Sequence, residues 1–208
     1  MRRRSAALCG LAAVAIAVAT PLLGGAARPG YAHTSQFISE LGERGAEYGG
    51  LVSALGFAPT GLLVLLFLAF AAPAFPRSWR TAIGLLGFAA VGVAYLVASI
   101  ARCDAGCPSK GSTAQTVHNL FGALEYIGAF AGLLLLASAF ATAPAWRSLA
   151  AATRVCAIAV GAGFALAVVP SLAPLRGISQ RLAEAGIFLW IALVATALLR
   201  TQDGRQPS

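Results

Sequence analysis

Long apolar runs separated by short polar segments dominate the sequence pattern of this chain. Five runs contain no charged side chain and cover residues 5–27, 51–76, 81–101, 126–146 and 155–175. A sixth apolar run, residues 177–199, is charged only at Arg181 and Glu184, near its start. A helix of about 20 apolar residues crosses the hydrocarbon core of a bilayer. The pattern therefore predicts an all-α, polytopic membrane bundle of six transmembrane helices.

The expected helix boundaries follow from these runs and from the polar residues between them. Transmembrane helices are expected at residues 5–25, 50–74, 80–101, 115–142, 147–172 and 177–200, with a short outer interfacial helix at 35–47. No linker divides the chain, so residues 1–208 are expected to form a single integral membrane domain. The first run also resembles a secretory signal, but its apolar core of about 18 residues exceeds the usual range of about 7–15. A retained helix is favoured, and a cleaved signal is the alternative.

Composition changes this picture mainly through the placement of charge. The chain is 59% hydrophobic and 11% charged, and its net charge of +8 would indicate nucleic acid in a soluble protein. With the N-terminus inside, nine arginines and one aspartate fall on the inner side, whereas six basic and six acidic residues fall on the outer side. This asymmetry follows the positive-inside rule. It predicts cytoplasmic N- and C-termini, the cytoplasmic membrane of the cell as location, anionic lipid as a partner, and no nucleic acid.

Two internal similarities raise the question of a repeat. Gly61–Ser78 resembles Gly132–Ser148, and both end in an arginine-serine pair on the inner side. Three segments at the outer starts of the even-numbered helices, residues 44–50, 122–128 and 181–187, each centre on a glutamate. Three tandem helical hairpins, related by an axis along the membrane normal, would explain both similarities. A sequence rich in Ala, Gly and Leu also produces such likeness by chance, so both explanations stay open.

The segment between the third and fourth predicted helices collects residues with distinctive chemistry. Cys103 and Cys107 flank Asp104 in a loop that the predicted topology places outside, where thiols oxidise. A disulfide needs Cα atoms about 5.5 Å apart, which this short loop permits. A zinc site would use both cysteines and His118, with Asp104 or His33, but structural zinc sites have a different spacing. The favoured interpretation is a Cys103–Cys107 disulfide and no metal.

Ionisable side chains within the predicted membrane helices form a second group of candidates. His118 and Glu125 are seven residues apart and share one helix face, while Glu184 reaches a similar depth on the last helix. A carboxylate in hydrocarbon costs several kcal/mol unless it is protonated, paired or exposed to water, so both glutamates should face the bundle interior. Desolvation would keep such a glutamate protonated, which suits a general acid, and His118 would then act as a base or proton shuttle.

Further candidates surround this group. Glu40 and Glu47 precede the second helix and are included as candidate acid–base residues, although a solvated acidic face over a lid helix is the favoured explanation of that segment. The candidates for substrate binding are Tyr95, Ser99, Arg102, Asp104 and Arg181. The alternative to a functional cavity is that the two outer arginines of this group form ion pairs with Glu125 and Glu184 and lock the helices together.

Short motifs in these outer segments resemble a known family. The motifs are Ser39–Gly42, the Cys103–Pro108 loop, His118 at the start of the fourth helix and Gln180–Glu184 at the start of the sixth. They are similar to the multi-pass bacterial family catalogued as domain of unknown function 998. The likeness covers nearly the whole chain, and the number of helices agrees. The resemblance implies an uncharacterised integral membrane protein and no particular activity.

Three classes of function remain. The favoured one is an intramembrane acid–base enzyme acting on a lipid or isoprenoid, with terpene-cyclase-like proton chemistry in an outward-facing cavity lined by Glu125 and Glu184. The alternatives are a proton-coupled carrier, which with six helices would need a homo-oligomer, and a non-catalytic scaffold or sensor. No cofactor is expected, because two histidines on the outer side cannot carry a two-haem relay and no glycine-rich phosphate loop follows a strand. The expected partners are membrane lipid and a hydrophobic small molecule.

Overall fold

The computed structural model describes residues 1–200 and contains helices and no strands over that range. Six of its helices are long and apolar enough to cross a membrane. They cover Arg2–Ala27, Gly49–Ala74, Trp79–Ile100, Thr113–Thr142, Pro144–Ala167 and Pro170–Arg200. The predicted all-α bundle of six spans is thus confirmed, and the chain is a multi-pass membrane protein.

Several spans are built from more than one helical element. The first span is α1 (Arg2–Ala27), and the second joins α2 (Gly49–Leu51), the π-helix η2 (Val52–Phe57), α3 (Ala58–Ala71) and the short turn η3 (Ala72–Ala74). The others are α4 (Trp79–Ile100), α5 (Thr113–Thr142), η4 with α6 (Pro144–Trp146, Arg147–Ala167) and η5 with α7 (Pro170–Leu175, Arg176–Arg200). One more turn, η1 (Ile38–Gly42), lies in the connection between α1 and α2.

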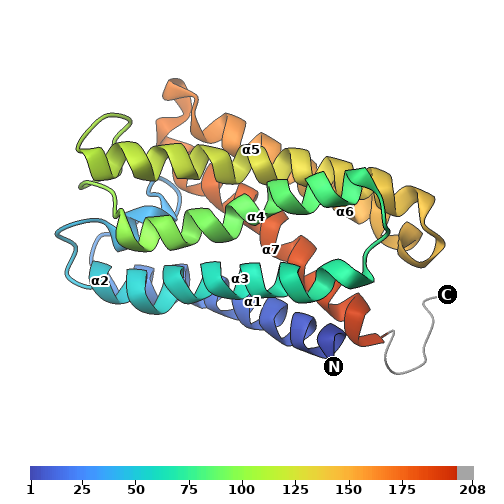
Figure 1. Ribbon diagram of the computed structural model, residues 1–208. Coiled ribbons are helices and arrows are strands. Elements are labelled where there is room, and N and C mark those ends of the chain that lie inside the picture. Colours follow the sequence, from blue (N-terminus) through green and yellow to red (C-terminus); the bar gives the residue numbers. More distant parts are fainter. Residues whose placement is uncertain (201–208) are drawn as a thin grey trace.

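The six spans pack in chain order around the bundle. Each span contacts the next, and α1 also contacts α7, so the spans form a closed ring. Figure 1 shows the start of α1, the end of α7 and the two short connections α3–α4 and α5–α6 at one end of the bundle. The three longer connections lie at the opposite end. Within residues 1–200, the arginines on which the predicted inside orientation rests lie toward the end with the short connections.

An aromatic cluster around Trp190 fills the half of the bundle nearer the short connections. The Trp190 ring on α7 is fully buried and lies 4.4 Å from the Phe88 ring and 6.1 Å from the Phe67 ring, measured between centroids. Phe75, at the end of the second span, completes the cluster. This half is therefore a packed apolar core, and the polar interior residues lie in the other half.

Glycines bring α4 and α5 unusually close together. A Cβ atom on Gly132 would lie 2.6 Å from the carbonyl oxygen of Gly84, and one on Gly128 would lie 2.5 Å from that of Gly87. Larger side chains at these positions would push the helices apart, and small residues are the usual solution for close helix packing in membranes. The contact fixes α5 against α4 one turn beyond Glu125.

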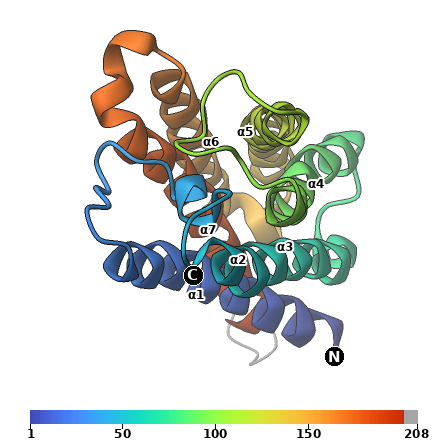
Figure 2. The same ribbon diagram turned by 90° about the vertical axis from the view of Figure 1, so that its left-hand side faces the viewer.

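The outer segment before α2 is less helical than the sequence predicts. In place of a helix over residues 35–47, the chain forms the five-residue η1 and then turns up to Tyr48. The Glu40 carboxylate accepts a hydrogen bond from the backbone N–H of Phe37, and the Arg102 side chain binds the carbonyl oxygen of Gly42. Side chains thus satisfy backbone groups that a longer helix would pair internally. Figure 2, viewed from this end, shows η1 lying across the helix ends.

Candidate functional site

The two deepest glutamates lie in one small chamber between α4, α5 and α7. Glu184 is 8% exposed and accepts hydrogen bonds from the hydroxyl groups of Tyr95, at 2.9 Å, and Tyr126, at 2.7 Å. Glu125 is 6% exposed, and its Oε1 atom has no hydrogen-bond partner within residues 1–200. Three residues that the sequence analysis singled out separately, Glu125, Glu184 and Tyr95, are therefore neighbours in space.

The chamber is small and partly roofed by the outer segment. Its volume is about 70 Å³, and Ile38 and Ser39 from η1 and Phe57 from the end of η2 form part of its wall. A polar space of this size holds a few water molecules or the reacting end of a larger molecule. The π-helix that positions Phe57 fits a site of this kind, because such wide turns are frequent at functional sites.

A larger cavity, which we call the vestibule, adjoins the chamber on its outer side. The vestibule measures about 520 Å³. The residues common to both cavities are Ser39, His118, Gly122, Tyr126 and Gln180. The remaining vestibule walls come from the Cys107–Ser109 part of the α4–α5 connection, from α6 and from the α6–α7 connection. The chamber therefore shares a wall with a space large enough for a small-molecule ligand.

His118 stands between the two cavities. Its Nδ1 atom lies 3.1 Å from the carbonyl oxygen of Ala101. Because a carbonyl oxygen can only accept, Nδ1 carries the hydrogen in this contact, and the neutral ring keeps its free electron pair on Nε2. The side chain can accept a proton at that nitrogen, as the sequence analysis proposed.

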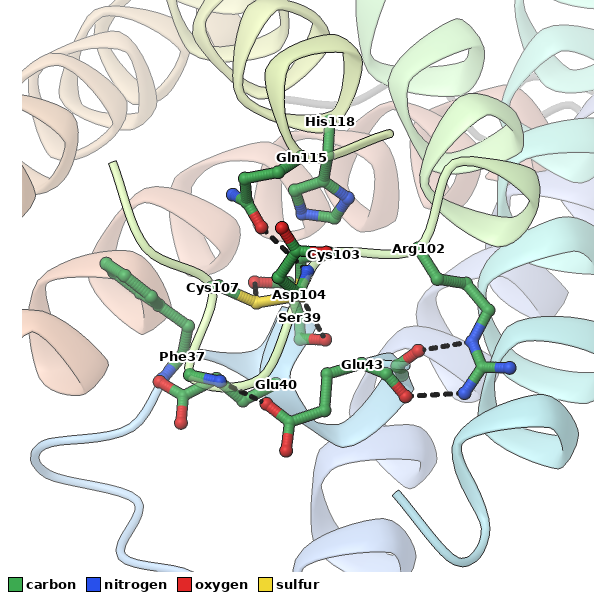
Figure 3. Close-up of a disulfide and its surroundings, with 12 residues drawn as sticks. Phe37, Ser39, Glu40, Glu43, Arg102, Cys103, Asp104, Cys107, Gln115 and His118 are labelled. Carbon is green, nitrogen blue, oxygen red and sulfur yellow. Dashed lines mark hydrogen bonds between the residues drawn. A yellow bond between two sulfur atoms is a disulfide. The ribbon is translucent and has the colours of Figure 1, made fainter. Parts of the chain in front are cut away.

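The outer arginines do not pair with the chamber glutamates. Arg102 donates to the carbonyl oxygens of Gly42, at 2.6 Å, and Glu43, at 2.5 Å (Figure 3). Arg181 donates to the carbonyl oxygen of His33 at 2.7 Å and to the hydroxyl of Tyr31 at 2.8 Å. Both guanidinium groups hold the segment of residues 28–48, which we call the outer lid. The interpretation of the two glutamates as partners of helix-locking ion pairs is wrong.

The acidic residues of the outer lid also serve to hold it. Glu40 is 2% exposed and pairs with Arg176 on α7 at 2.9 Å. Glu43 is buried as well and pairs with Arg28 at 2.6 Å. The expected solvated acidic face is therefore wrong for these two residues, because the lid folds inward onto arginines, whereas Glu47 is exposed. Neither Glu40 nor Glu47 lines the chamber.

The predicted Cys103–Cys107 disulfide is present beneath the lid (Figure 3). The Ser39 hydroxyl lies 3.4 Å from the Cys107 sulfur, so the disulfide packs against the roof of the chamber. The two sulfurs and a ring nitrogen of His118 lie within 4.8 Å of one another, as they would around a metal ion. Because the sulfurs are bonded to each other, neither is the thiolate that a zinc site requires.

Asp104 joins the disulfide loop to the first turn of α5. Its carboxylate accepts hydrogen bonds from the Ser112 backbone N–H, at 2.8 Å, and hydroxyl, at 2.9 Å, and it pairs with Arg44 of the lid. The Ser112 backbone bond, followed by the Arg44 contact, lowers the pKa of Asp104 to about 2. Asp104 therefore orders the loop and does not reach the chamber.

Of the five substrate-binding candidates, Tyr95 alone lines the chamber. The Ser99 hydroxyl donates to the Leu96 carbonyl of its own helix at 2.7 Å. Tyr126 and Gln180 also line the chamber, although neither is among the residues predicted from the sequence. The Gln180 amide donates to the Tyr126 hydroxyl at 3.1 Å. Their sequence positions indicate this location, because Tyr126 directly follows Glu125 and Gln180 lies one helical turn before Glu184.

Comparison with known proteins identifies a family and no characterised relative. No curated protein and no solved structure gives a significant match to this chain. The family model described as Protein of unknown function (DUF998) matches residues 11–197, which include all six spans in large part, the outer lid and the chamber. The chain therefore belongs to the DUF998 family, whose function is unknown, as the resemblance of its outer motifs indicates.

Proposed function

We propose that this protein is an intramembrane acid–base enzyme that acts on a lipid or isoprenoid substrate. The observation that carries the proposal is the Glu125 carboxyl group, which is buried, lacks a hydrogen-bond partner at Oε1 among the described residues, and shares a chamber with Glu184. A buried polar group without a partner costs stability, and such groups cluster where a protein performs chemistry. A purely structural carboxyl would be expected to have found a donor.

The two carboxyl groups have different surroundings, which assigns them different roles. Two phenol hydroxyls donate to Glu184, which suits an ionised carboxylate that stabilises positive charge. Within residues 1–200, the Oε1 atom of Glu125 has no donor and no cation pairs with this carboxyl, so the neutral acid is the form that avoids the cost of a buried charge. Two neighbouring carboxyls sharing one proton is a recurring arrangement in acid–base catalysis. Glu125 is then the general acid.

The reaction class is a proton-initiated isomerisation or cyclisation. The Glu125 O–H bond breaks as its proton bonds to an alkene carbon or an epoxide oxygen, leaving a carbocation. The electron pair of a second alkene then forms a carbon–carbon bond, and a neighbouring C–H bond breaks to release a proton to Nε2 of His118. Return of that proton through the chamber to Glu125 restores the enzyme. The product is an isomer of the substrate, so the reaction needs no oxidant or reductant.

The chamber walls suit a cationic intermediate. The rings of Phe57, Tyr95 and Tyr126 line it, and aromatic faces attract cations. Its volume of about 70 Å³ accommodates the reacting end of the substrate, while the vestibule takes the rest. A carrier needs access from both sides. The aromatic cluster around Trp190, about 9 Å along α7 from Glu184, argues against this alternative.

The proposed location is the cytoplasmic membrane, with both termini inside. Within residues 1–200, the half of the bundle where α1 starts and α7 ends carries eight arginines and no acidic side chain, whereas the half with the outer lid carries six basic and six acidic side chains. Cytoplasmic connections carry the excess of arginine and lysine in membrane proteins. The chamber and the vestibule would then open toward the outside of the cell.

The test is solvent-deuterium incorporation into linear isoprenoid alkenes, because a proton that adds to an alkene carbon leaves deuterium on carbon, whereas one that adds to an epoxide oxygen does not. The purified protein in liposomes is incubated in D₂O, and the recovered isoprenoids are analysed by mass spectrometry. The wild type is expected to produce isomers carrying deuterium on carbon. Glu125→Gln should lower the rate by about 10²–10⁴-fold, the usual contribution of a general acid. Glu47→Gln, a matched change at an exposed glutamate, should leave it unchanged.

Undiminished incorporation in Glu125→Gln would refute the proposal. A result in which no isoprenoid incorporates deuterium, but proton flux into the liposomes depends on Glu125, would favour the carrier instead.

A further inference from the structure

A stacked aromatic pair separates the vestibule from the lipid-facing surface of the bundle. The rings of Tyr126 on α5 and Phe164 on α6 lie 5.4 Å apart between centroids, with an angle of 30° between their planes. Both residues line the vestibule. Both also line a second space of about 430 Å³ between α5 and α6, which we call the lateral groove. The pair is thus a shared wall between the groove and the site.

The lateral groove faces the hydrocarbon of the bilayer. Its walls include Ile127 and Phe130 from α5 and Ile158 from α6, which are 54%, 37% and 62% exposed on the surface of two membrane spans. Gly161 also lines the groove. A Cβ atom at this position would lie 2.8 Å from the Phe130 ring, so the absence of a side chain leaves room for that ring. A groove of this volume is in the range of ligand sites, and the surrounding lipid is its natural source of ligands.

The same aromatic pair is linked to the acid–base chamber. The Tyr126 hydroxyl donates to Glu184 at 2.7 Å and accepts from Gln180 at 3.1 Å. A chain that passes between the two rings must part them, and movement of the Tyr126 ring strains its bond to Glu184. The lateral route and the chamber carboxylate are therefore linked through Tyr126.

We propose that the substrate is a single-chain amphiphile that reaches the chamber sideways from the bilayer, between α5 and α6, by parting Tyr126 and Phe164. Its apolar chain occupies the lateral groove, its polar end faces Asn119, Gln180 and Arg176 in the vestibule, and its reacting segment enters the chamber. Tyr126 is a positioning residue that couples the arrival of substrate to Glu184. The chemistry of this step rests on the proposed function, but the route does not.

The experiment is photolabelling with a diazirine-bearing farnesol analogue in liposomes containing the full chain. After irradiation, adducts are mapped by mass spectrometry. The wild type is expected to be labelled at Glu184 on α7, which lines the chamber but neither the vestibule nor the groove. Ile158→Trp and Ile127→Trp fill the groove from opposite walls, and each should reduce this labelling by about tenfold. Ile83→Trp, at a lipid-facing position of α4 outside the groove, should not.

A further variant sharpens the outcome. Phe164→Ala removes one half of the pair and should increase chamber labelling. Chamber labelling that stays at the wild-type level in both groove-filling variants would overturn the lateral route. Absence of chamber labelling in the wild type would overturn it too.

The route and the proposed function fail in different ways. Labelling requires no turnover, so Glu125→Gln should be labelled like the wild type if the route is correct. A Glu125→Gln variant that is labelled normally and still incorporates deuterium would overturn the proposed function and leave the route standing. If turnover is lost in Glu125→Gln but the groove-filling substitutions leave chamber labelling unchanged, the route alone is overturned.

Discussion

Tyr95 on α4 donates a hydrogen bond of 2.9 Å to Glu184 on α7. The bond joins two spans that are distant in the chain and turns the carboxyl group toward the bundle interior. Together with the bond from Tyr126, it holds Glu184, and no cation among residues 1–200 pairs with this carboxyl group, which is unusual for an acidic side chain at membrane depth. The geometry of the chamber depends on these two phenols.

Removal of the Tyr95 hydroxyl should destabilise the fold measurably. Tyr95→Phe keeps the ring but leaves Glu184 with one donor fewer. A hydrogen bond to a charged group contributes about 1.5–3 kcal/mol, so the free energy of unfolding should fall by about that amount. Unfolding of the purified protein in detergent measures it, and Tyr48→Phe, at an exposed tyrosine, is the control. Equal stability of Tyr95→Phe and the wild type would mean that the bond contributes nothing.

Reduction of the Cys103–Cys107 disulfide should loosen the roof of the chamber. For a closed loop this short, the chain-entropy model gives about 2 kcal/mol of stabilisation. The melting temperature of the wild type should therefore fall when a reductant is added. A Cys103→Ser, Cys107→Ser double variant should start at the lower value and be insensitive to the reductant. Rapid alkylation of Cys103 before any reduction would show that the disulfide does not form.

Stability should depend on pH through Asp104. The pKa of this carboxyl is lowered from 3.8 to about 2 by Ser112 and Arg44, so the folded state favours the charged form. This stabilisation is fully present when the pH is above 3.8, the pKa of Asp104 in the unfolded chain, and it is lost as the pH falls toward the folded pKa of about 2. Melting temperatures measured across that range should drop in the wild type. Asp104→Asn should be less stable near neutral pH and lose less on acidification, whereas a slope identical to that of the wild type would contradict the assignment.

The sequence predicts the framework well because hydropathy alone determines it. Runs of about 20 apolar residues leave few alternatives to spanning helices, since backbone groups must be satisfied internally in lipid. The interior position of Glu125 and Glu184 follows from the same reasoning, because a carboxyl group facing hydrocarbon is too costly. Their convergence on one chamber, with Tyr95, is the part of the site that this argument anticipates.

The outer lid is where prediction from sequence fails. From the sequence, Glu40 is expected to be exposed to solvent. Arg102 and Arg181 are expected to form ion pairs with buried glutamates. In the structure, the two arginines instead bind lid carbonyl groups, and Glu40 is buried against Arg176. These contacts join segments separated by more than 50 residues, and their geometry depends on an irregular backbone that no periodic pattern encodes. The same holds for the contact between Tyr126 and Phe164.

The central claim is that Glu125 is a neutral acid, enclosed with Glu184, and infrared spectroscopy tests it most directly. The purified protein near neutral pH should show the carbonyl stretch of a protonated carboxylic acid, shifted in D₂O. This band should disappear in Glu125→Gln and persist in Glu47→Gln. A wild-type spectrum without the band, or a band that survives in Glu125→Gln, would contradict the account.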